Sequence, residues 1–281
     1  MKPAHALITG AGGFLGGALC RSVPAGWHVT GVIRRSPAPL CVDAVACELT
    51  DADAVAEMLA AVAPTVVIHC AYSHDRADIV DATTVTAAAC AAAGVGLIAL
   101  STDVVFGGDN PPYEETDVPD PIIDYGRAKR DAEHAIVASC SDAAIVRTSL
   151  IVGRDAIDPV TRWLVEPNRR GETVTLFSDE VRAPVLVDDL CSGLWELAAM
   201  SPLDRSGFWH LVGPDRLSRT ELGDILAGWF DLDRDLILGA PQSTSATVRP
   251  RDVSLASARA QGLSSFRPLS LDTVQAHGSD S

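Results

Sequence analysis

The chain of 281 residues lacks several features, and each absence excludes a class of protein. It contains no run of about 18 uninterrupted apolar residues, so no transmembrane helix is predicted, and "MKPAHALITG" leads into a strand rather than a signal-peptide pattern. The formal net charge is −15, which argues against a general nucleic-acid binder, because neutralising phosphates requires clustered Lys and Arg. We therefore expect a cytoplasmic protein with no membrane or nucleic-acid partner.

Cysteine pairs of the CxxC type are also missing. The seven cysteines are scattered and form no Cys/His cluster with metal-ligand spacing, so we predict no metal site and expect reduced, mostly buried thiols. His69 and Cys70 lie in the apolar stretch "TVVIHCA". The pattern of a buried strand there favours a packing role over a nucleophile or metal ligand.

The composition, with 47% hydrophobic and 21% charged residues, is typical of a globular protein. Short apolar runs, "HALITG", "HVTGVI", "TVVIHCA", "GLIALST" and "AAIVRTS", alternate with Ala-rich stretches long enough for one helix each. The stretch 76–93 reads as a helix that ends at Gly94. This alternation predicts an α/β fold in which residues 1–150 form a Rossmann-type, doubly wound parallel sheet that binds NAD(P).

The pattern loosens after about residue 150. A loop with Pro159 and Pro167 is expected before a strand "ETVTLF", followed by a strand and helix in "VRAPVLVDDLCSGLWELA" and a strand in "FWHLVG". The helix "LSRTELGDILAGWF" opens with capping-box spacing at Ser218. We expect 151–281 to form a smaller C-terminal substrate-binding lobe, with some elements returning to the main sheet and a disordered tail at 275–281.

A glycine-rich turn follows the first predicted strand. The stretch "ALITGAGGFLGGALC" places Gly10, Gly13 and Gly16 between that strand and a helix. Glycines permit the unusual turn, the close approach of a pyrophosphate and tight helix packing, while the helix N-terminus offers free N–H groups. An ordinary tight turn is the alternative, and the strand-loop-helix context favours a dinucleotide site. The predicted cofactor contacts of this turn are Thr9, Gly10, Gly13, Phe14, Leu15 and Gly16.

The second predicted strand ends in "GVIRRS" without an acidic residue. An acid there suits a free ribose 2′-hydroxyl and an arginine suits a 2′-phosphate, so Arg34 and Arg35 favour NADP(H) and leave NAD(H) as the alternative. The other interpretation is that both arginines lie in a solvated loop and contact no cofactor. Glu48 and Asp51 follow in "CELTD", where either lies near the adenine or caps the next helix. We assign Glu48, Leu49, Cys70 and Ala71 to the cofactor site as well.

A hydroxyl, a phenol and an ammonium group come next. "LIALSTDVVFGG" ends a strand at Thr102, and "DYGRAKRDAEHA" places Tyr125 and Lys129 four residues apart, on one face of a predicted helix. An ordinary phenol, with a pKa of about 10, exchanges protons poorly at neutral pH. We expect the nearby ammonium group and the helix N-terminus to lower the pKa of Tyr125. An isolated pair of this kind is also compatible with two surface side chains of an amphipathic helix.

Together, the glycine turn, Thr102 and the Tyr125/Lys129 pair resemble the extended short-chain dehydrogenase/reductase family over nearly the whole chain. Within it, the dTDP-4-dehydrorhamnose reductase group is most similar, through "PTVVIHCAYS", "STDVVFGG", "PPYEETDVPDP", "YGRAKRDAE", "VRTSLIVG", "SGFWHLVGPDRLSRTEL" and "RPRDVSL". The resemblance implies an NADPH-dependent ketoreductase acting on a nucleotide-linked 4-keto-deoxysugar or similar small substrate. Tyr125 would protonate the developing alkoxide, Thr102 would hydrogen-bond the same oxygen, and Lys129 would hold the nicotinamide ribose.

The chain departs from this group at positions that face the sugar. Rhamnose-forming reductases usually carry an aromatic residue at the place of Val104, and many carry Trp at the place of Leu150. A helix asparagine used as a proton relay has no counterpart, since the first asparagine is Asn110, which leaves a hydroxyl such as Thr83 or water for that role. The predicted substrate contacts are Thr102, Asp103, Val104, Leu150 and Arg182.

The stretch "VRAPVLVDD" resembles epimerases and dehydratases, in which the arginine contacts the substrate diphosphate. Arg182 is therefore a candidate anion clamp, and an exposed strand-end arginine without a partner is the alternative. An epimerase or dehydratase with a recycled nicotinamide is the second functional hypothesis, against which Arg34 and Arg35 argue. A non-catalytic nucleotide-binding regulatory subunit is the third, because fold does not decide function. The resemblance also allows a homodimer.

Overall fold

The computed structural model describes residues 4–34, 37, 39, 41–154 and 157–274. Arg35 and the tail 275–281, for which predictions were made, lie outside these residues. Among the described residues, no helix has the length and apolar character needed to cross a membrane.

A seven-stranded sheet forms the centre of the molecule, in the strand order β11-β6-β5-β4-β1-β2-β3. Every neighbouring pair is parallel. The strands are β1 (Ala4–Thr9), β2 (Trp27–Ile33), β3 (Asp43–Ala46), β4 (Val66–His69), β5 (Gly96–Thr102), β6 (Ala144–Thr148) and β11 (Gly207–His210). The predicted Rossmann-type parallel sheet is confirmed, and β11 joins its edge from the second half of the chain.

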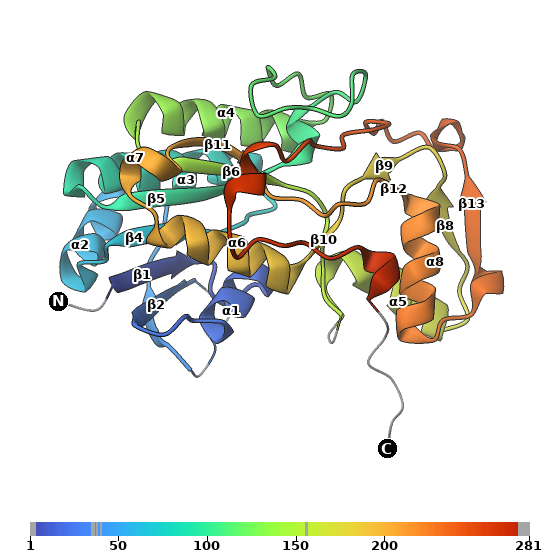
Figure 1. Cartoon of the computed structure of the whole chain (residues 1–281), viewed down its shortest axis with the longest axis horizontal. Helices are drawn as coiled ribbons and strands as arrows, with labels where there is room; N and C mark the ends of the chain where they lie inside the picture. Colours follow the sequence, from blue (N-terminus) through green and yellow to red (C-terminus); the bar gives the residue numbers. More distant parts are fainter. Residues whose placement is uncertain (1–3, 35–36, 38, 40, 155–156, 275–281) are drawn as a thin grey trace.

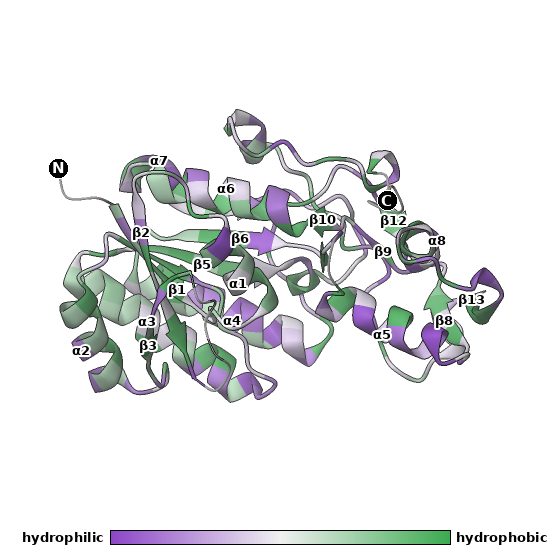
Figure 2. Cartoon of the chain, turned by 90° about the horizontal axis from the view of Figure 1, so that it is seen from below, coloured by the Kyte–Doolittle hydropathy of each residue, from purple (hydrophilic) through white to green (hydrophobic). Residues whose placement is uncertain are grey.

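Helices cover both faces of the sheet (Figure 1). Alternate residues of β1 face opposite sides of the sheet: Ile8 packs in the core with Leu19 of α1 (Phe14–Arg21), whereas Leu7 packs in the core with Leu59 of α2 (Ala52–Val62). Both sheet faces are therefore buried, which explains the apolar runs of the strands (Figure 2). The helices are α1 (Phe14–Arg21), α2 (Ala52–Val62), α3 (Arg76–Ala93), α4 (Asp124–Ser139), α6 (Val187–Ala199) and α7 (Pro202–Arg205). The predicted end of α3 at Gly94 is confirmed.

A smaller group of elements packs at one end of the sheet, around Leu164, Leu176 and Leu226 (Figure 1). Its elements are α5 (Pro159–Arg169), β8 (Val174–Phe177), α8 (Arg219–Phe230) and β13 (Ile237–Ala240), with β8 parallel to β13. Short strands connect it to the main sheet: β7 (Ile151–Val152) pairs with β10 (Val185–Leu186), and β9 (Val181–Arg182) pairs with β12 (Leu217–Ser218). The capping box at Ser218 is confirmed.

The predicted loop around Pro159 and Pro167 is wrong, because these residues lie in α5. Pro159 occupies the first turn, where a missing N–H is tolerated, and Asp158 at the N-cap forms a capping box with Thr161. Pro167 falls near the last turn of the helix. Two prolines in eleven residues thus mark the ends of a helix here rather than a loop.

Candidate active site

A cavity of about 690 Å³ opens at the carboxyl ends of β1, β2, β4 and β5 and extends toward the smaller group of elements. This is the edge at which open parallel sheets bind ligands, and the volume lies in the range of small-molecule pockets. Several predicted site residues line it: Gly10, Gly13, Phe14, Gly16, Arg34, Glu48, Leu49, Cys70, Ala71, Thr102, Tyr125, Leu150 and Arg182.

The glycine turn has the geometry that a dinucleotide requires. Gly10 has a φ of +68°, in the left-handed region that favours glycine. A Cβ on Gly16 would lie 2.2 Å from the carbonyl oxygen of Gly10, so only glycine lets α1 pack this closely. Gly13 caps α1 without any side-chain hydrogen bond, which leaves the N-terminal N–H groups for an anion. The residues present therefore fit the pyrophosphate of a nicotinamide dinucleotide.

Three predicted contacts of the cofactor do not line the cavity: Thr9, Leu15 and Lys129. Thr9 is fully buried, where its Oγ1 accepts a hydrogen bond from the Ala71 backbone N–H at 3.1 Å. Leu15 packs against the hydrophobic core under α1. Thr9 and Leu15 thus support the walls of the cavity rather than contacting its contents.

Arg34 lies at the cavity wall between two carboxylates. Its Nη1 is 3.8 Å from Glu48 Oε2 and 3.7 Å from Asp78 Oδ2. Asp78, in the first turn of α3, is a cavity residue that sequence reasoning missed. Asp51 caps a helix, the second of the two roles predicted for it: its side chain caps α2 and accepts hydrogen bonds from two backbone N–H groups.

Thr102 and Tyr125 meet at the cavity. Thr102 ends β5, and Tyr125 lies in the first turn of α4. Gly126 permits this approach, since a Cβ there would lie 2.1 Å from the Val104 carbonyl oxygen. Val104 itself is buried and does not line the cavity. A hydroxyl and a phenol, both able to donate to a carbonyl oxygen, therefore share one wall.

Lys129 is nearly buried one turn further along α4, and its Nζ donates to the Leu100 carbonyl at 3.0 Å. Burial lowers the pKa of Lys129 to about 8, against the opposing influence of Cys70 and Glu133. The predicted lowering of the Tyr125 pKa is wrong for this structure, because burial raises that pKa. Tyr72 and Asp103 raise it further, and Arg182 supplies the opposing positive charge.

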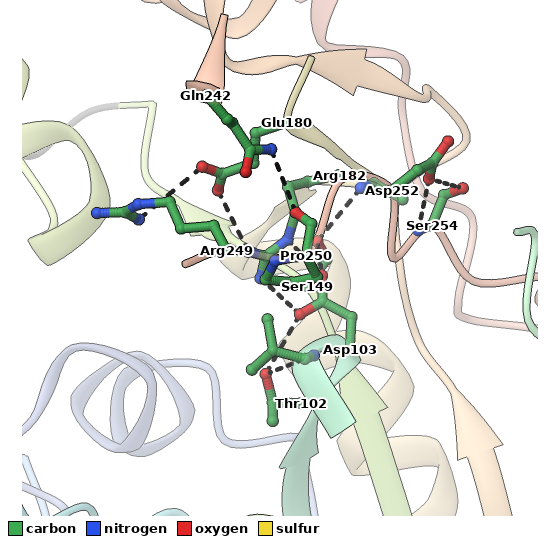
Figure 3. A network of polar contacts seen from close by, with 12 residues as sticks. Thr102, Asp103, Ser149, Glu180, Arg182, Gln242, Arg249, Pro250, Asp252 and Ser254 are labelled. Atoms are coloured by element: carbon green, nitrogen blue, oxygen red, sulfur yellow. Dashed lines mark hydrogen bonds and ion pairs between the residues drawn. The ribbon is translucent and has the colours of Figure 1, made fainter. Parts of the chain in front are cut away.

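The interpretation of Arg182 as an exposed arginine without a partner is wrong. Arg182 is 9% exposed, and its Nε and Nη2 donate to the fully buried Asp103 at 2.8 and 2.5 Å (Figure 3). Asp103 does not line the cavity, although Arg182 does. This ion pair joins β9 to the residue directly after β5.

Tyr72 is a second cavity residue that the sequence did not reveal. It follows β4, is 57% exposed, and its ring meets that of Tyr125 edge-on at a centroid distance of 5.9 Å. Its position two residues after Cys70, at the end of a buried strand, is the signal that would have found it.

The remaining polar groups near β4 have structural partners. His69 is buried between Thr9 and Thr83, at 3.0 and 3.2 Å, and burial lowers its pKa to about 3, so its ring is neutral. Thr83 donates to the Ile79 carbonyl at 2.7 Å. Burial raises the pKa of the Cys70 thiol, which makes it a poor nucleophile. In the described part of the chain, no group of three or more His, Cys, Asp or Glu residues could hold a metal ion.

Comparison with known proteins agrees with this architecture. The model of the family described as RmlD substrate binding domain matches residues 4–269, and the chain belongs to that family. It is homologous to NAD(P)-dependent oxidoreductases of the extended short-chain dehydrogenase/reductase type.

The relatives include proteins named as reductases and a protein named as a subunit of methionine adenosyltransferase. A hypothetical dTDP-4-dehydrorhamnose reductase from Sulfolobus tokodaii has a TM-score of 0.81 at 28% identity, covering 95% of this chain and 98% of that chain. A dTDP-4-dehydrorhamnose reductase from Bacillus anthracis, in complex with NADP, has a TM-score of 0.81 at 22% identity, covering 96% of each chain. Methionine adenosyltransferase 2 subunit beta of Danio rerio is 30% identical over 271 residues, covering 90% of this chain and 83% of the relative. A probable low-salt glycan biosynthesis reductase of Haloferax volcanii is 29% identical over 250 residues, covering 83% and 82%.

Proposed function

We propose that the protein is an NADPH-dependent ketoreductase that reduces the keto group of a nucleotide-linked deoxysugar. The observation that carries this proposal is the position of Thr102 and Tyr125 on the same cavity as the glycine turn. A dinucleotide bound at Gly10 and the N-terminus of α1 would run along the sheet edge toward the two hydroxyl groups. Residues 1–150 would bind the cofactor, and 151–281 would enclose the substrate.

The chain's own residues would act on the carbonyl oxygen. The nicotinamide supplies the hydride when bound. The Tyr125 hydroxyl would donate its proton to the oxygen as negative charge develops, and its raised pKa keeps it protonated at neutral pH. The Thr102 hydroxyl would hold the same oxygen, and Lys129 would serve the nicotinamide ribose from beneath Tyr125.

The preference for NADPH rests on Arg34. Its guanidinium group faces Glu48 and Asp78 at 3.7 to 3.8 Å, so a 2′-phosphate would compete with two carboxylates for the same cation. A free 2′-hydroxyl would instead donate to either carboxylate, which keeps NADH as an alternative.

The substrate class rests on the relatives, whose names include dTDP-4-dehydrorhamnose reductases and a probable glycan biosynthesis reductase. Leu150 is on the cavity wall, whereas Val104 is buried away from it, so these two positions offer no aromatic wall for a sugar. Tyr72 offers one instead, because its exposed ring stands beside Tyr125. A cytoplasmic location and a homodimer remain predictions.

A regulatory subunit is the second candidate function. It is favoured by the relatives named methionine adenosyltransferase 2 subunit beta, to which the chain is 30% identical. The presence of Thr102, Tyr125 and Lys129 on or beside the cavity favours the reductase.

The test is to mix the protein with NADPH and a panel of dTDP-4-keto sugars and to follow the loss of reduced-cofactor absorbance. Net oxidation is expected for the reductase. Product formation without net oxidation would indicate an epimerase or dehydratase, and cofactor binding with no turnover on any sugar would favour the regulatory subunit.

A further inference from the structure

We propose that Arg182 and Asp103 are positioning residues, whose buried ion pair orients the Thr102 hydroxyl and ties β9 to the catalytic end of β5. This inference rests on the proposed reductase function. It replaces the role of anion clamp that the sequence suggested for Arg182.

The ion pair is bidentate and closed to water. Asp103 is fully buried and Arg182 is 9% exposed, with Nε and Nη2 each donating to a different carboxylate oxygen (Figure 3). The two residues are 79 positions apart and come from different parts of the fold. Their contact therefore fixes how the substrate side of the cavity meets the sheet.

Asp103 also holds two hydroxyl groups. Thr102 Oγ1 donates to Oδ1 at 3.2 Å, and Ser149 Oγ donates to Oδ2 at 2.6 Å. The Val104 backbone N–H donates to Thr102 Oγ1 at 3.4 Å. Asp103 accepts the single hydroxyl proton of Thr102 here, so donation to a substrate oxygen requires that proton to turn away from Oδ1. Asp103 thus sets the position of Thr102 Oγ1, and Asp103 is itself held by Arg182.

Two carboxylates, those of Asp103 and Glu180, already lie against the guanidinium group of Arg182. Its third nitrogen, Nη1, lies 3.6 Å from Glu180 Oε1, and Arg249 Nη1 lies 3.8 Å from Glu180 Oε2 (Figure 3). The negative charges of Asp103 and Glu180 offset the positive charge of the guanidinium group, which weakens its attraction for a diphosphate. Arg182 therefore acts through Asp103.

The two charges of the ion pair also have opposite effects on the pKa of Tyr125. Asp103 after β5 raises the Tyr125 pKa and Arg182 on β9 opposes it, while Tyr72 after β4 acts in the same direction as Asp103. Asp124, Arg127 and Lys129 are the charged groups of α4 near Tyr125. Neutralising one member of the ion pair should shift the Tyr125 pKa, and neutralising both should cancel the shift.

The first test separates positioning from anion binding with Arg182→Met. Loss of positioning lowers kcat about 100-fold and changes the KM for the sugar nucleotide less than about threefold, because a misplaced donor affects the transition state. A KM raised about tenfold or more with kcat retained would show an anion clamp and overturn the proposal. Arg216→Met is the matched control, since Arg216 forms an exposed ion pair with Asp252 in the same part of the fold.

The second test uses pH profiles of kcat/KM for reduction, which fall where the Tyr125 phenol ionises. Asp103→Asn removes a negative charge that raises the Tyr125 pKa and keeps the positive charge of Arg182 beside Glu180, so the basic limb should move to lower pH. The double variant Asp103→Asn/Arg182→Met should move the limb back toward that of the wild type. A limb that does not move in Asp103→Asn, or is not restored in the double variant, contradicts the proposal.

A substrate-free measurement keeps this inference separate from the proposed function. The ultraviolet absorbance of tyrosinate, with the Tyr125→Phe signal subtracted, reports the ionisation of Tyr125 directly. If the wild type reduces no sugar, the reductase function fails, and the same downward shift in Asp103→Asn still supports the ion pair. Equal ionisation of Tyr125 in the wild type and Asp103→Asn would overturn it.

Discussion

Glu133 of α4 and Arg147 of β6 form a second buried ion pair, which ties the helix that carries Tyr125 to the sheet. Both side chains are about 1–2% exposed, and Arg147 Nε and Nη2 donate to the two oxygens of Glu133 at 3.0 and 2.8 Å. Ser101 donates to the same carboxylate. Arg147 also stacks on the ring of Phe208, with 4.2 Å between the guanidinium carbon and the ring centroid. We expect Glu133→Gln to destabilise the fold strongly, because it leaves the Arg147 charge buried without its carboxylate.

The magnitude follows from the loss of one partner. Removing one member of a buried ion pair destabilises by about 3–5 kcal/mol. The cation–π contact is already present in the wild type, so it does not offset this loss. Arg147 Nη1 already has no hydrogen-bond partner among the described residues, so the unpaired guanidinium has few alternatives. At about 2–4 °C per kcal/mol for a chain of this size, Tm should fall by at least about 6 °C.

Differential scanning calorimetry of the wild type, Glu133→Gln and Glu133→Gln/Arg147→Met measures this effect. The double variant should recover most of the lost Tm, since it buries no unpaired charge. Glu172→Gln is the control, because its ion pair with Arg170 is exposed. A fall below about 2 °C in Glu133→Gln, or a double variant less stable than the single one, would refute the reasoning.

Three further predictions concern the cofactor site. Gly16→Ala should raise the Kd for NADPH at least about tenfold by calorimetric titration, because its Cβ would strike backbone. Gly17→Ala is the milder control, since its nearest contact is the flexible end of Arg21 at 3.2 Å and the Ala11 carbonyl oxygen lies at 3.4 Å, an ordinary contact. Arg34→Ala should lower the ratio of kcat/KM for NADPH to that for NADH about tenfold or more, and an unchanged ratio would remove the basis of the NADPH preference. Lys129→Met should unfold at higher denaturant concentration than the wild type at pH 7. The pKa of Lys129 in the folded protein, about 8, lies below its unfolded value, so burying the charged ammonium group destabilises the fold by up to about 3 kcal/mol. This destabilisation is complete below pH 8 and disappears as the pH rises toward 10.5. A gap between the two proteins that widens as pH rises would contradict this.

Much of the fold follows from local patterns in the sequence. The apolar runs located six of the seven strands of the sheet, including β11 in "FWHLVG", because buried parallel strands are apolar on both faces. β3 was missed because it is a four-residue edge strand with mostly exposed side chains. α5 was missed because proline was taken as a sign of a loop, although it fits the first turn of a helix.

The site was only partly predictable, because its chemistry depends on contacts between distant residues. Thr102 and Tyr125 were found through strand ends and helix spacing, and both line the cavity. The partner of Arg182 could not be found, since Asp103 lies 79 residues away and no local pattern links them. The pKa of Tyr125 was predicted in the wrong direction because spacing shows that Lys129 is near and does not show how deeply Tyr125 is buried.

The most direct test of the proposed function follows the hydride itself. The protein is incubated with a dTDP-4-keto-deoxysugar and NADPH that carries deuterium at the transferable nicotinamide position, and the product is analysed by mass spectrometry and NMR. We predict one deuterium on the new carbinol carbon, one NADPH oxidised per product, and loss of turnover by about 100-fold or more in Tyr125→Phe. A product without deuterium, or full turnover by Tyr125→Phe, would contradict the account.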